Sequence, residues 1–281
     1  MQVPSCLCGS QDFATVFTYH SAPPGEVQFD FGAVPYFRQI LRCNRCGHFV
    51  SVHDIDMRAL YTRHYVNATY GADGLRRAFD RIVSLQESAS DNVGRVEGLR
   101  EYCGQHFNKK LASGGVPTVL DVGSGLCVFL HRLHRLTGWP CTALDPDKRA
   151  AMHAIEVAGV GGMCADFMQS ADIGRFDLIT FNKVLEHVAD PVAMLARARE
   201  HLMPGGLAYV ELPDGEIART EGYMREEFFI DHHHVFSLAS IRILAEHAGF
   251  QCEHVERLRE PSSKYTLRAF LTVVDNAFRR A

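Results

Sequence analysis

Two acidic residues stand at the ends of neighbouring apolar runs, where they could bind a small ligand. Asp121 opens the turn Asp121-Val-Gly-Ser-Gly125, which follows the apolar run 116–120 and precedes a helical pattern that begins at Val128. In such a unit, glycines let backbone N–H groups approach a ligand at the helix N-terminus. Val128 replaces the third glycine of a dinucleotide-binding turn, and the acid at the start would repel a pyrophosphate. The turn therefore favours a ligand that carries positive charge.

The second acid, Asp145, ends the run Cys141-Thr-Ala-Leu144, twenty residues after Gly125. A carboxylate at that strand tip can accept hydrogen bonds from both hydroxyls of a ribose. Taken alone, the two acids fit a nicotinamide-dependent enzyme almost as well, so the cofactor stays open at this point.

Four of the nine cysteines form two short pairs near the N-terminus, Cys6-Leu-Cys8-Gly9 and Cys43-Asn-Arg-Cys46-Gly47. Two tight turns that each offer two thiolates meet the tetrahedral preference of Zn²⁺, and the glycine after each pair lets the turn close. The sequence predicts a structural zinc site formed by Cys6, Cys8, Cys43 and Cys46. Because a C-x-C pair is less usual than C-x₂-C, His48 or a shifted turn is an alternative source of one ligand. Buried free cysteines are the alternative to zinc.

The densest group of ionisable residues is Asp231-His-His-His234, just before a predicted helix that has Ser237 as its N-cap and Gly249 after its end. A histidine near its usual pKa of about 6.5 can remove a proton at neutral pH, and a neighbouring carboxylate can orient it. We expect His232 first, and His234 second, to act as a general base, with Asp231 as the orienting group. The alternative is that a histidine here only bonds the backbone and fixes the start of the helix.

These groups require more than one structural module to position them. The chain has 281 residues with 47% hydrophobic content, enough for a large core and an appended module. Cysteine spacing predicts a zinc-ribbon-like module over 1–56, and apolar periodicity between residues 75 and 103 predicts a helical linker or cap over 57–112. Residues 113–281 then form the core, with a substrate-binding insertion at about 213–236. The expected fold class is α/β, with a Rossmann-like doubly wound sheet, a small N-terminal zinc-binding module and a helical cap.

Composition excludes other classes of protein. The net charge of −4 and the pI near 6.4 argue against a broad nucleic-acid-binding surface. No apolar run approaches about 20 residues, and no basic-then-apolar signal opens the chain, so we expect no membrane span and a cytoplasmic location. Cysteines in that compartment are reduced or bind metals.

Residues from about 115 to 250 resemble a class I S-adenosylmethionine-dependent methyltransferase of the small-molecule branch. The resemblance depends on the glycine turn together with four segments in order: Cys164-Ala-Asp166-Phe167, Phe176-Asp-Leu-Ile-Thr-Phe181, Leu185-Glu-His-Val-Ala-Asp-Pro191 and Leu202-Met-Pro-Gly-Gly-Leu-Ala-Tyr-Val-Glu211. It implies that Asp121, Gly123 and Gly125 hold the methionine part of the cofactor and that Asp145 binds its ribose. It also implies that Asp166 and Phe167 flank the adenine and that Asn182 lines the cleft. Core packing is the alternative for Phe167.

The cysteine turn 43–47, followed by Tyr61, Tyr65 and Tyr70, resembles enzymes that methylate sugars of nucleotide-activated or surface-polysaccharide pathways. This implies a sugar, nucleotide-sugar or glycan-precursor acceptor. Methyl transfer from a sulfonium needs alignment and loss of one proton, because the leaving group departs neutral. The family's stretch Glu-His-x-His-x-Phe-Ser matches residues 231–237. The polar residues of the insertion favour a hydroxyl-rich acceptor; they are Glu221, Glu226, Glu227, Asp231 and His232–His234.

Rival functions remain. A quinone or polyketide O-methyltransferase is the nearest alternative. A zinc-containing rRNA methyltransferase is disfavoured because residues 1–56 hold more acids than arginines, and a non-catalytic scaffold is disfavoured because the cofactor residues are intact. Glu186-His187 resembles a stretch of ubiquinone-pathway O-methyltransferases, in which an acid three residues earlier helps to bind a metal. That position is Lys183 here, so the sequence argues against a catalytic divalent ion and predicts a structural or substrate-edge role for His187. The oligomeric state is not predicted.

Overall fold

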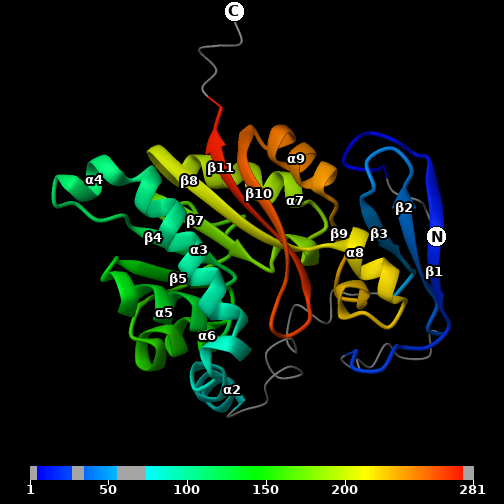
Figure 1. Cartoon of the computed structure of the whole chain (residues 1–281), viewed down its shortest axis with the longest axis horizontal. Helices are drawn as coiled ribbons and strands as arrows, with labels where there is room; N and C mark the ends of the chain where they lie inside the picture. The colour runs from blue at the N-terminus through cyan, green and yellow to red at the C-terminus, as the bar shows by residue number, and fades with distance from the viewer. Residues whose placement is uncertain (1–4, 27–34, 56–73, 275–281) are drawn as a thin grey trace, which may run out of the picture. The chain divides into compact units, whose positions relative to one another are not determined.

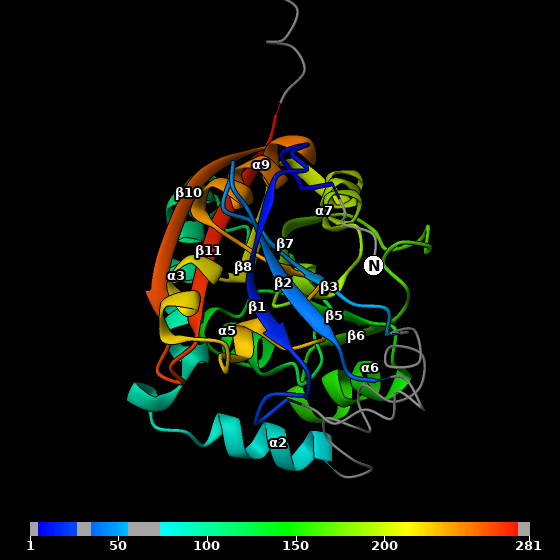
Figure 2. The ribbon, with the colours of Figure 1, turned by 90° about the vertical axis from the view of Figure 1, so that its right-hand side faces the viewer.

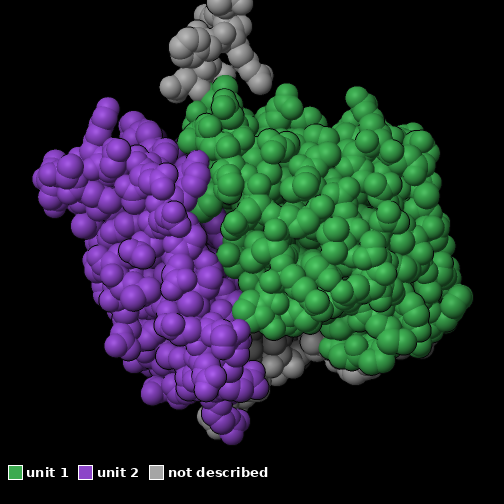
Figure 3. All heavy atoms as spheres, in the orientation of Figure 1, with its two compact units in different colours: residues 1–69, 183–196, 210–281 green, residues 70–182, 197–209 purple. Residues whose placement is uncertain are grey.

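The computed structural model describes residues 5–26, 35–55 and 74–274, and the chain divides into two compact units. Unit 1 comprises residues 1–69, 183–196 and 210–281, and unit 2 comprises residues 70–182 and 197–209 (Figure 3). Tyr61, Tyr65 and Tyr70 lie outside the described residues. The three-part division expected from the sequence stays a prediction.

Unit 2 contains a parallel sheet with the strand order β7-β4-β5-β6. Its strands are β4 (Val119–Val122), β5 (Cys141–Asp145), β6 (Gly161–Cys164) and β7 (Phe176–Asn182). All four residues of β4 are buried, as expected for a strand covered on both faces. The chain continues from β4 to β5 on one side and returns to β7 on the other, so the carboxyl ends of these strands border a topological switch point. Ligands of open α/β sheets bind at such a point.

The helices of unit 2 cover this sheet and the glycine turn. Helix α5 (Val128–Thr137) follows β4, and α6 (Lys148–His153) follows β5 and continues into a π-helical turn, Ala154–Ala158. The predicted helical segment is present as α2 (Gly74–Val83), α3 (Asp91–His106) and the short α4 (Asn108–Ala112), with a 3₁₀ turn at Glu87–Ala89. Helix α3 packs against α5, and α2 packs against α5 and α6.

Strand β8 (Leu202–Pro213) contributes residues to both units and is preceded by α7 (Pro191–Ala198) and a 3₁₀ turn, Arg199–His201. The complete strand order is β10-β11-β8-β7-β4-β5-β6 (Figure 1). The closing hairpin, β10 (Phe250–Arg259) and β11 (Tyr265–Val273), is antiparallel, with a register shift between Cys252 and His254. The Rossmann-like α/β sheet predicted from the sequence is confirmed.

Unit 1 contains a second, antiparallel sheet in the order β1-β2-β3-β9, whose first three strands lie side by side in Figure 2. The strands are β1 (Phe13–Tyr19), β2 (Arg38–Cys43), β3 (Phe49–Val52) and β9 (His234–Val235). His234 pairs with Val50, so the histidine-rich segment forms an edge strand of the N-terminal sheet. Its core consists of Tyr19, Ile40, Phe49, Ala218, Phe228 and Val235.

The rest of unit 1 is built from short turns and one longer helix. The short elements are a 3₁₀ turn at Leu185–His187, helix α8 (Gly215–Ala218), and 3₁₀ turns at Arg219–Glu221 and Glu226–Phe228. Helix α9 (Leu238–His247) begins with the predicted cap, because Ser237 Oγ accepts from Ser240 N at 2.9 Å within a capping box. No helix within the described ranges has the length and apolar content needed to cross a membrane.

Candidate functional site

The end of β4 and the glycine turn form the first candidate site. Asp121 is 3% exposed, and its Oδ1 accepts from Thr180 Oγ1 at 2.6 Å and from Asn182 Nδ2 at 2.7 Å. Burial raises the pKa of Asp121 to about 7, although these two hydrogen bonds oppose the shift. Gly123 and Gly125 both have positive φ, at 70° and 49°, so the turn needs glycine at these positions. The structure therefore brings the predicted Asp121 and Asn182 together at the switch point.

Asp145 fixes the turn from the neighbouring strand. One carboxylate oxygen accepts from Gly125 N at 3.0 Å, and the other accepts from Asp147 N at 2.8 Å. Burial raises the pKa of Asp145, and these two N–H groups oppose that shift. A Cβ added at Gly125 would meet nothing within 4 Å, so the turn faces open space.

Two buried polar atoms beside this space lack partners. Ser124 Oγ and Asn182 Oδ1 have no hydrogen-bond partner among the described residues. Buried polar groups in proteins are almost always paired, so a polar ligand at this position would satisfy both. The residues present thus fit a nucleoside cofactor with a cationic group.

Asp166 and Phe167 lie after β6 and differ in exposure. Asp166 is exposed, and its side chain accepts from Met168 N at 2.8 Å. Phe167 is 3% exposed, and its ring packs edge-on against Phe181 with the centroids 5.7 Å apart. Most of the Phe167 side chain is therefore packed in the core, as the alternative interpretation expected. The contact of Asp166 and Phe167 with adenine stays a prediction.

Helix α3 contributes residues that the sequence did not single out. Asn92 Nδ2 donates to Val128 O at 3.0 Å, which anchors α3 at the start of α5, and the charge of Arg95 lowers the pKa of Asp121. No sequence signal marked either residue, because the apolar periodicity of a helix does not say which neighbour it covers.

The four predicted thiols form the second candidate site. The Sγ atoms of Cys6, Cys8, Cys43 and Cys46 all lie within 4.8 Å of one another, with 3.4 Å between Cys6 and Cys46 and 3.6 Å between Cys8 and Cys43. Sulfurs bound tetrahedrally at about 2.3 Å from zinc are about 3.8 Å apart, so this set fits Zn²⁺. Burial would raise the pKa of Cys43, but the N–H groups of Cys46 and Arg45 outweigh it and lower that pKa to about 7.

His48 does not complete this set. Its Nδ1 lies 3.2 Å from Ser240 Oγ, and its Nε2 lies 3.0 Å from His234 Nδ1. The alternative in which His48 replaces a cysteine ligand is therefore wrong. His48 instead links the cysteine turn to the histidine segment, and Ser237 Oγ adds a second link by donating to Cys46 O at 2.6 Å.

The predicted bases differ in how their ring nitrogens are used. His232 Nδ1 donates to Glu227 O at 2.8 Å, which leaves the lone pair on Nε2. Burial lowers the pKa of His232, so the ring is neutral at pH 7. Both nitrogens of His234 face partners, His48 and Ala189 O, and burial lowers its pKa to about 4. The geometry ranks His232 above His234 as a proton acceptor.

Asp231 contacts His187. Its carboxylate lies 3.7 Å from His187 Nδ1, and its backbone oxygen accepts from the same atom at 2.9 Å. Burial alone would raise the pKa of Asp231, but the charges of His232 and His187 lower it. Asp231 thus orients His187, and it influences His232 through charge.

Glu186 joins these histidines in a cluster that sequence reasoning missed. Ligand atoms of Glu186, His187 and His232 all lie within 4.8 Å of one another. Glu186 is 0% exposed, and within the described ranges neither of its carboxylate oxygens has a hydrogen-bond partner. The sequence did not indicate this cluster because His232 lies far from Glu186 along the chain.

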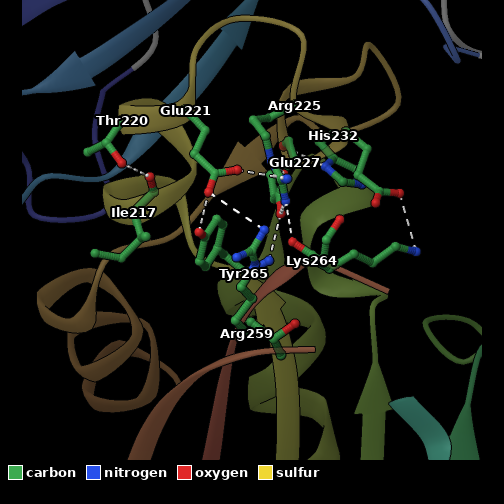
Figure 4. A network of polar contacts seen from close by, with 12 residues as sticks. Ile217, Thr220, Glu221, Arg225, Glu227, His232, Arg259, Lys264 and Tyr265 are labelled. Atoms are coloured by element: carbon green, nitrogen blue, oxygen red, sulfur yellow. Dashed lines mark hydrogen bonds and ion pairs between the residues drawn. The ribbon is translucent and has the colours of Figure 1, made fainter. Parts of the chain in front are cut away.

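The acids of the insertion are used in internal contacts (Figure 4). Arg225 binds Glu227 through two nitrogens, at 2.7 and 3.0 Å, and also binds Glu221. Glu221 accepts from Tyr265 Oη, and Glu226 lies 3.3 Å from Lys264 Nζ. These three carboxylates therefore hold the hairpin β10–β11 to the insertion. They are used internally, and the hydroxyl-rich acceptor predicted from the whole polar set stays a prediction.

Comparison with known proteins gives a family and a fold. A family profile described as a methyltransferase domain matches residues 62–255. The chain is 35% identical over 100 residues to a ubiquinone biosynthesis O-methyltransferase of Caulobacter vibrioides, covering 33% of this chain and 39% of that protein. Across the first curated relatives, the match covers at most half of the relative's length.

Two solved structures share the fold. The Burkholderia thailandensis 1,6-didemethyltoxoflavin-N1-methyltransferase, solved with S-adenosylhomocysteine, superposes with a TM-score of 0.56 at 15% identity and covers 81% of this chain and 96% of its own. The magnesium protoporphyrin IX methyltransferase of Synechocystis, also solved with bound S-adenosylhomocysteine, gives 0.54 at 16% identity, covering 75% and 98%. At such identities the likeness concerns the fold alone.

Proposed function

Because the chain belongs to the methyltransferase-domain family, we propose that it transfers a methyl group from S-adenosylmethionine to a small polar acceptor. The observation that supports this best is the pair of buried carboxylates around the glycine turn, next to the unpartnered Ser124 and Asn182. The acceptor that we propose is a sugar, a nucleotide sugar or another glycan precursor. Neither a nucleic acid nor a membrane is expected as a partner.

The roles of the residues follow from their chemistry. S-adenosylmethionine supplies an electrophilic methyl group on a sulfonium. Asp121 places a negative charge where the cationic part of the cofactor binds, and Asp145 accepts hydrogen bonds from the ribose. The lone pair on His232 Nε2 is suited to take the proton that the acceptor hydroxyl loses. His187 and Asp231 position the histidine cluster.

A quinol or other phenolic acceptor is the second candidate. It is supported by the partial identity to ubiquinone biosynthesis O-methyltransferases and by the fact that three acids of the insertion are paired internally. The cysteine-containing N-terminal sheet is the feature that favours the sugar class instead.

We also propose that Cys6, Cys8, Cys43 and Cys46 hold a structural zinc ion, as the Sγ separations favour. A closed shell of four thiolates leaves no open position, so the ion would stabilise the turns rather than take part in catalysis. The cytoplasmic location expected from the sequence stays a prediction.

Calorimetric titration with S-adenosylmethionine and with NAD⁺, combined with metal analysis, tests the cofactor assignment. Saturable binding of S-adenosylmethionine alone is expected, with one zinc per chain. Asp145→Asn should weaken this binding, whereas the matched control Asp147→Asn, at a residue that caps α6 and pairs with Arg149, should not. Methyl transfer from labelled cofactor to nucleotide sugars and to catechols then separates the two acceptor classes. Binding of NAD⁺ but not of S-adenosylmethionine would reject the proposal.

A further inference from the structure

The carboxylate of Glu186 lies in an unusual environment for an acid. Its side chain is fully buried, and neither oxygen has a hydrogen-bond partner in the part of the chain that the structure describes. Burying an ionised carboxylate without a partner is strongly unfavourable, and such groups in proteins are paired or bind metals. A cation beside Glu186 would remove this cost.

The two neighbouring histidines are prepared for the same ligand. His187 Nδ1 donates to Asp231 O at 2.9 Å, and His232 Nδ1 donates to Glu227 O at 2.8 Å. Since a carbonyl only accepts, each ring carries its proton on Nδ1 and its lone pair on Nε2. Metal-binding histidines typically show this arrangement, in which a backbone carbonyl or carboxylate fixes the tautomer and the ring orientation.

The spacing of the three groups suits a cation. Three atoms that all lie within 4.8 Å of one another have a common point no more than about 2.8 Å from each. Zinc and related ions bind imidazole nitrogen and carboxylate oxygen at about 2.0 to 2.2 Å. Small rotations of the side chains would therefore close the shell.

We infer that Glu186, His187 and His232 bind a divalent transition-metal cation, with open coordination positions for oxygens of the acceptor. Two histidines and one carboxylate are a known ligand set for catalytic zinc and for non-haem iron(II). The catalytic role of the ion rests on the proposed function, whereas the binding of the ion does not depend on it.

This site differs from the metal site of ubiquinone-pathway O-methyltransferases that the sequence argued against, in which the residue at position 183 would be an acid. Lys183 contributes no ligand, because its Nζ donates to Thr266 Oγ1 at 2.9 Å. The third ligand is His232 from the insertion, which the tertiary structure brings to Glu186, and His233 N donates to Glu186 O at 2.8 Å to hold the two segments together.

The cation gives the cluster a second way to activate the acceptor. A hydroxyl bound to the ion has a lowered pKa and loses its proton to water. The oxygen lone pair then forms the bond to the methyl carbon, while the carbon–sulfur bond breaks and its electron pair stays on the neutral sulfur. In this scheme His232 is a metal ligand rather than a base. An acceptor with two adjacent hydroxyls, a vicinal diol or a catechol, can chelate the ion.

Titration of the metal-stripped full chain with Co²⁺ under reducing conditions tests the site directly. Thiolate ligation gives strong sulfur-to-cobalt charge-transfer bands, whereas ligation by histidine and carboxylate gives only weak visible bands. We expect two Co²⁺ per chain, one of each kind. Glu186→Gln should abolish the weak-band site or weaken it by about 100-fold or more, and should leave the thiolate bands unchanged. Cys43→Ser should do the reverse. Glu226→Gln, which changes an acid that pairs with Lys264 outside both clusters, should affect neither.

The outcomes separate the inference from the proposed function. A single Co²⁺ per chain with thiolate bands would overturn the cation site, as would a weak-band site that survives both Glu186→Gln and His232→Asn. Binding of S-adenosylmethionine, measured by calorimetry on the same samples, reports on the proposed function alone. Cofactor binding without the second cobalt therefore rejects the inference and keeps the proposal, and the second cobalt without cofactor binding does the opposite. Thermal melts of Glu186→Gln should show no loss of stability without metal, because the substitution keeps the shape of the side chain and breaks no hydrogen bond of the carboxylate among the described residues.

Discussion

The protonation of Asp121 should control the affinity for S-adenosylmethionine between pH 6 and pH 8. Burial raises the pKa of this carboxyl to about 7, and only the ionised form attracts a cationic ligand. Protons therefore compete with the cofactor, and affinity rises with pH. With a pKa of about 7, roughly one-tenth of the carboxyls are ionised at pH 6 and roughly nine-tenths at pH 8, so the Kd should fall about tenfold, or about 1.4 kcal/mol.

Isothermal titration calorimetry at pH 6, 7 and 8 measures this effect, and titrations in buffers of different ionisation enthalpy count the protons released. Asp121→Asn is the control, because its amide oxygen can still accept from Thr180 and Asn182 but cannot ionise. The variant should bind more weakly at pH 8 and lose the part of the pH dependence that Asp121 supplies. Any proton that the cofactor itself gains or loses between pH 6 and pH 8 affects both proteins equally, so it cancels when their pH dependences are compared. An identical pH dependence in the wild type and the variant would refute the reasoning.

Further predictions concern stability and turnover. The pKa of Asp121 is about 7 in the folded protein and near 3.8 in the unfolded chain, so the folded state is favoured most below pH 3.8 and loses this stability as pH rises through about 7. Asp121→Asn should therefore raise the free energy of unfolding of the ligand-free protein at pH 8, by on the order of 4 kcal/mol in urea titrations. His232→Ala should lower kcat by about 10² to 10⁴ with cofactor affinity unchanged, whereas unaltered turnover would remove His232 from the mechanism. Cys43→Ser should lose zinc and lower the Tm, unlike Cys252→Ser outside the cluster, and equal metal content in both would exclude the thiolate site. Arg38→Met should cost about 3 to 5 kcal/mol in urea titrations by leaving Glu26 buried without its ion-pair partner, and a loss below about 1 kcal/mol would contradict this.

Local chemistry explains why much of the fold was predictable. The turn at Asp121 and the cap at Ser237 depend on a few consecutive residues, so their types were enough to place them. The pairs at Cys6 and Cys43 are also local, and the structure brings their four sulfur atoms within 4.8 Å of one another. The helices between residues 75 and 103 followed from apolar periodicity, although the break between α2 and α3 did not.

Contacts between distant segments were not predictable in the same way. The acids of the insertion suggested an acceptor surface, but Tyr265 and Lys264 of the closing hairpin bind Glu221 and Glu226 across long sequence separations. The proximity of His232 to Glu186 and His187 was likewise not predictable, because a sequence shows only the neighbours along the chain.

The sequence by itself thus determined the α/β sheet, the glycine turn with its two acids and the two cysteine pairs, because each of these features depends on the residue types of short stretches. Only the tertiary structure decided that His48 binds His234, that β9 pairs with β3, and that His232 meets Glu186 and His187. These contacts depend on burial and on the closure of long loops, whose free energy no local pattern of residues specifies.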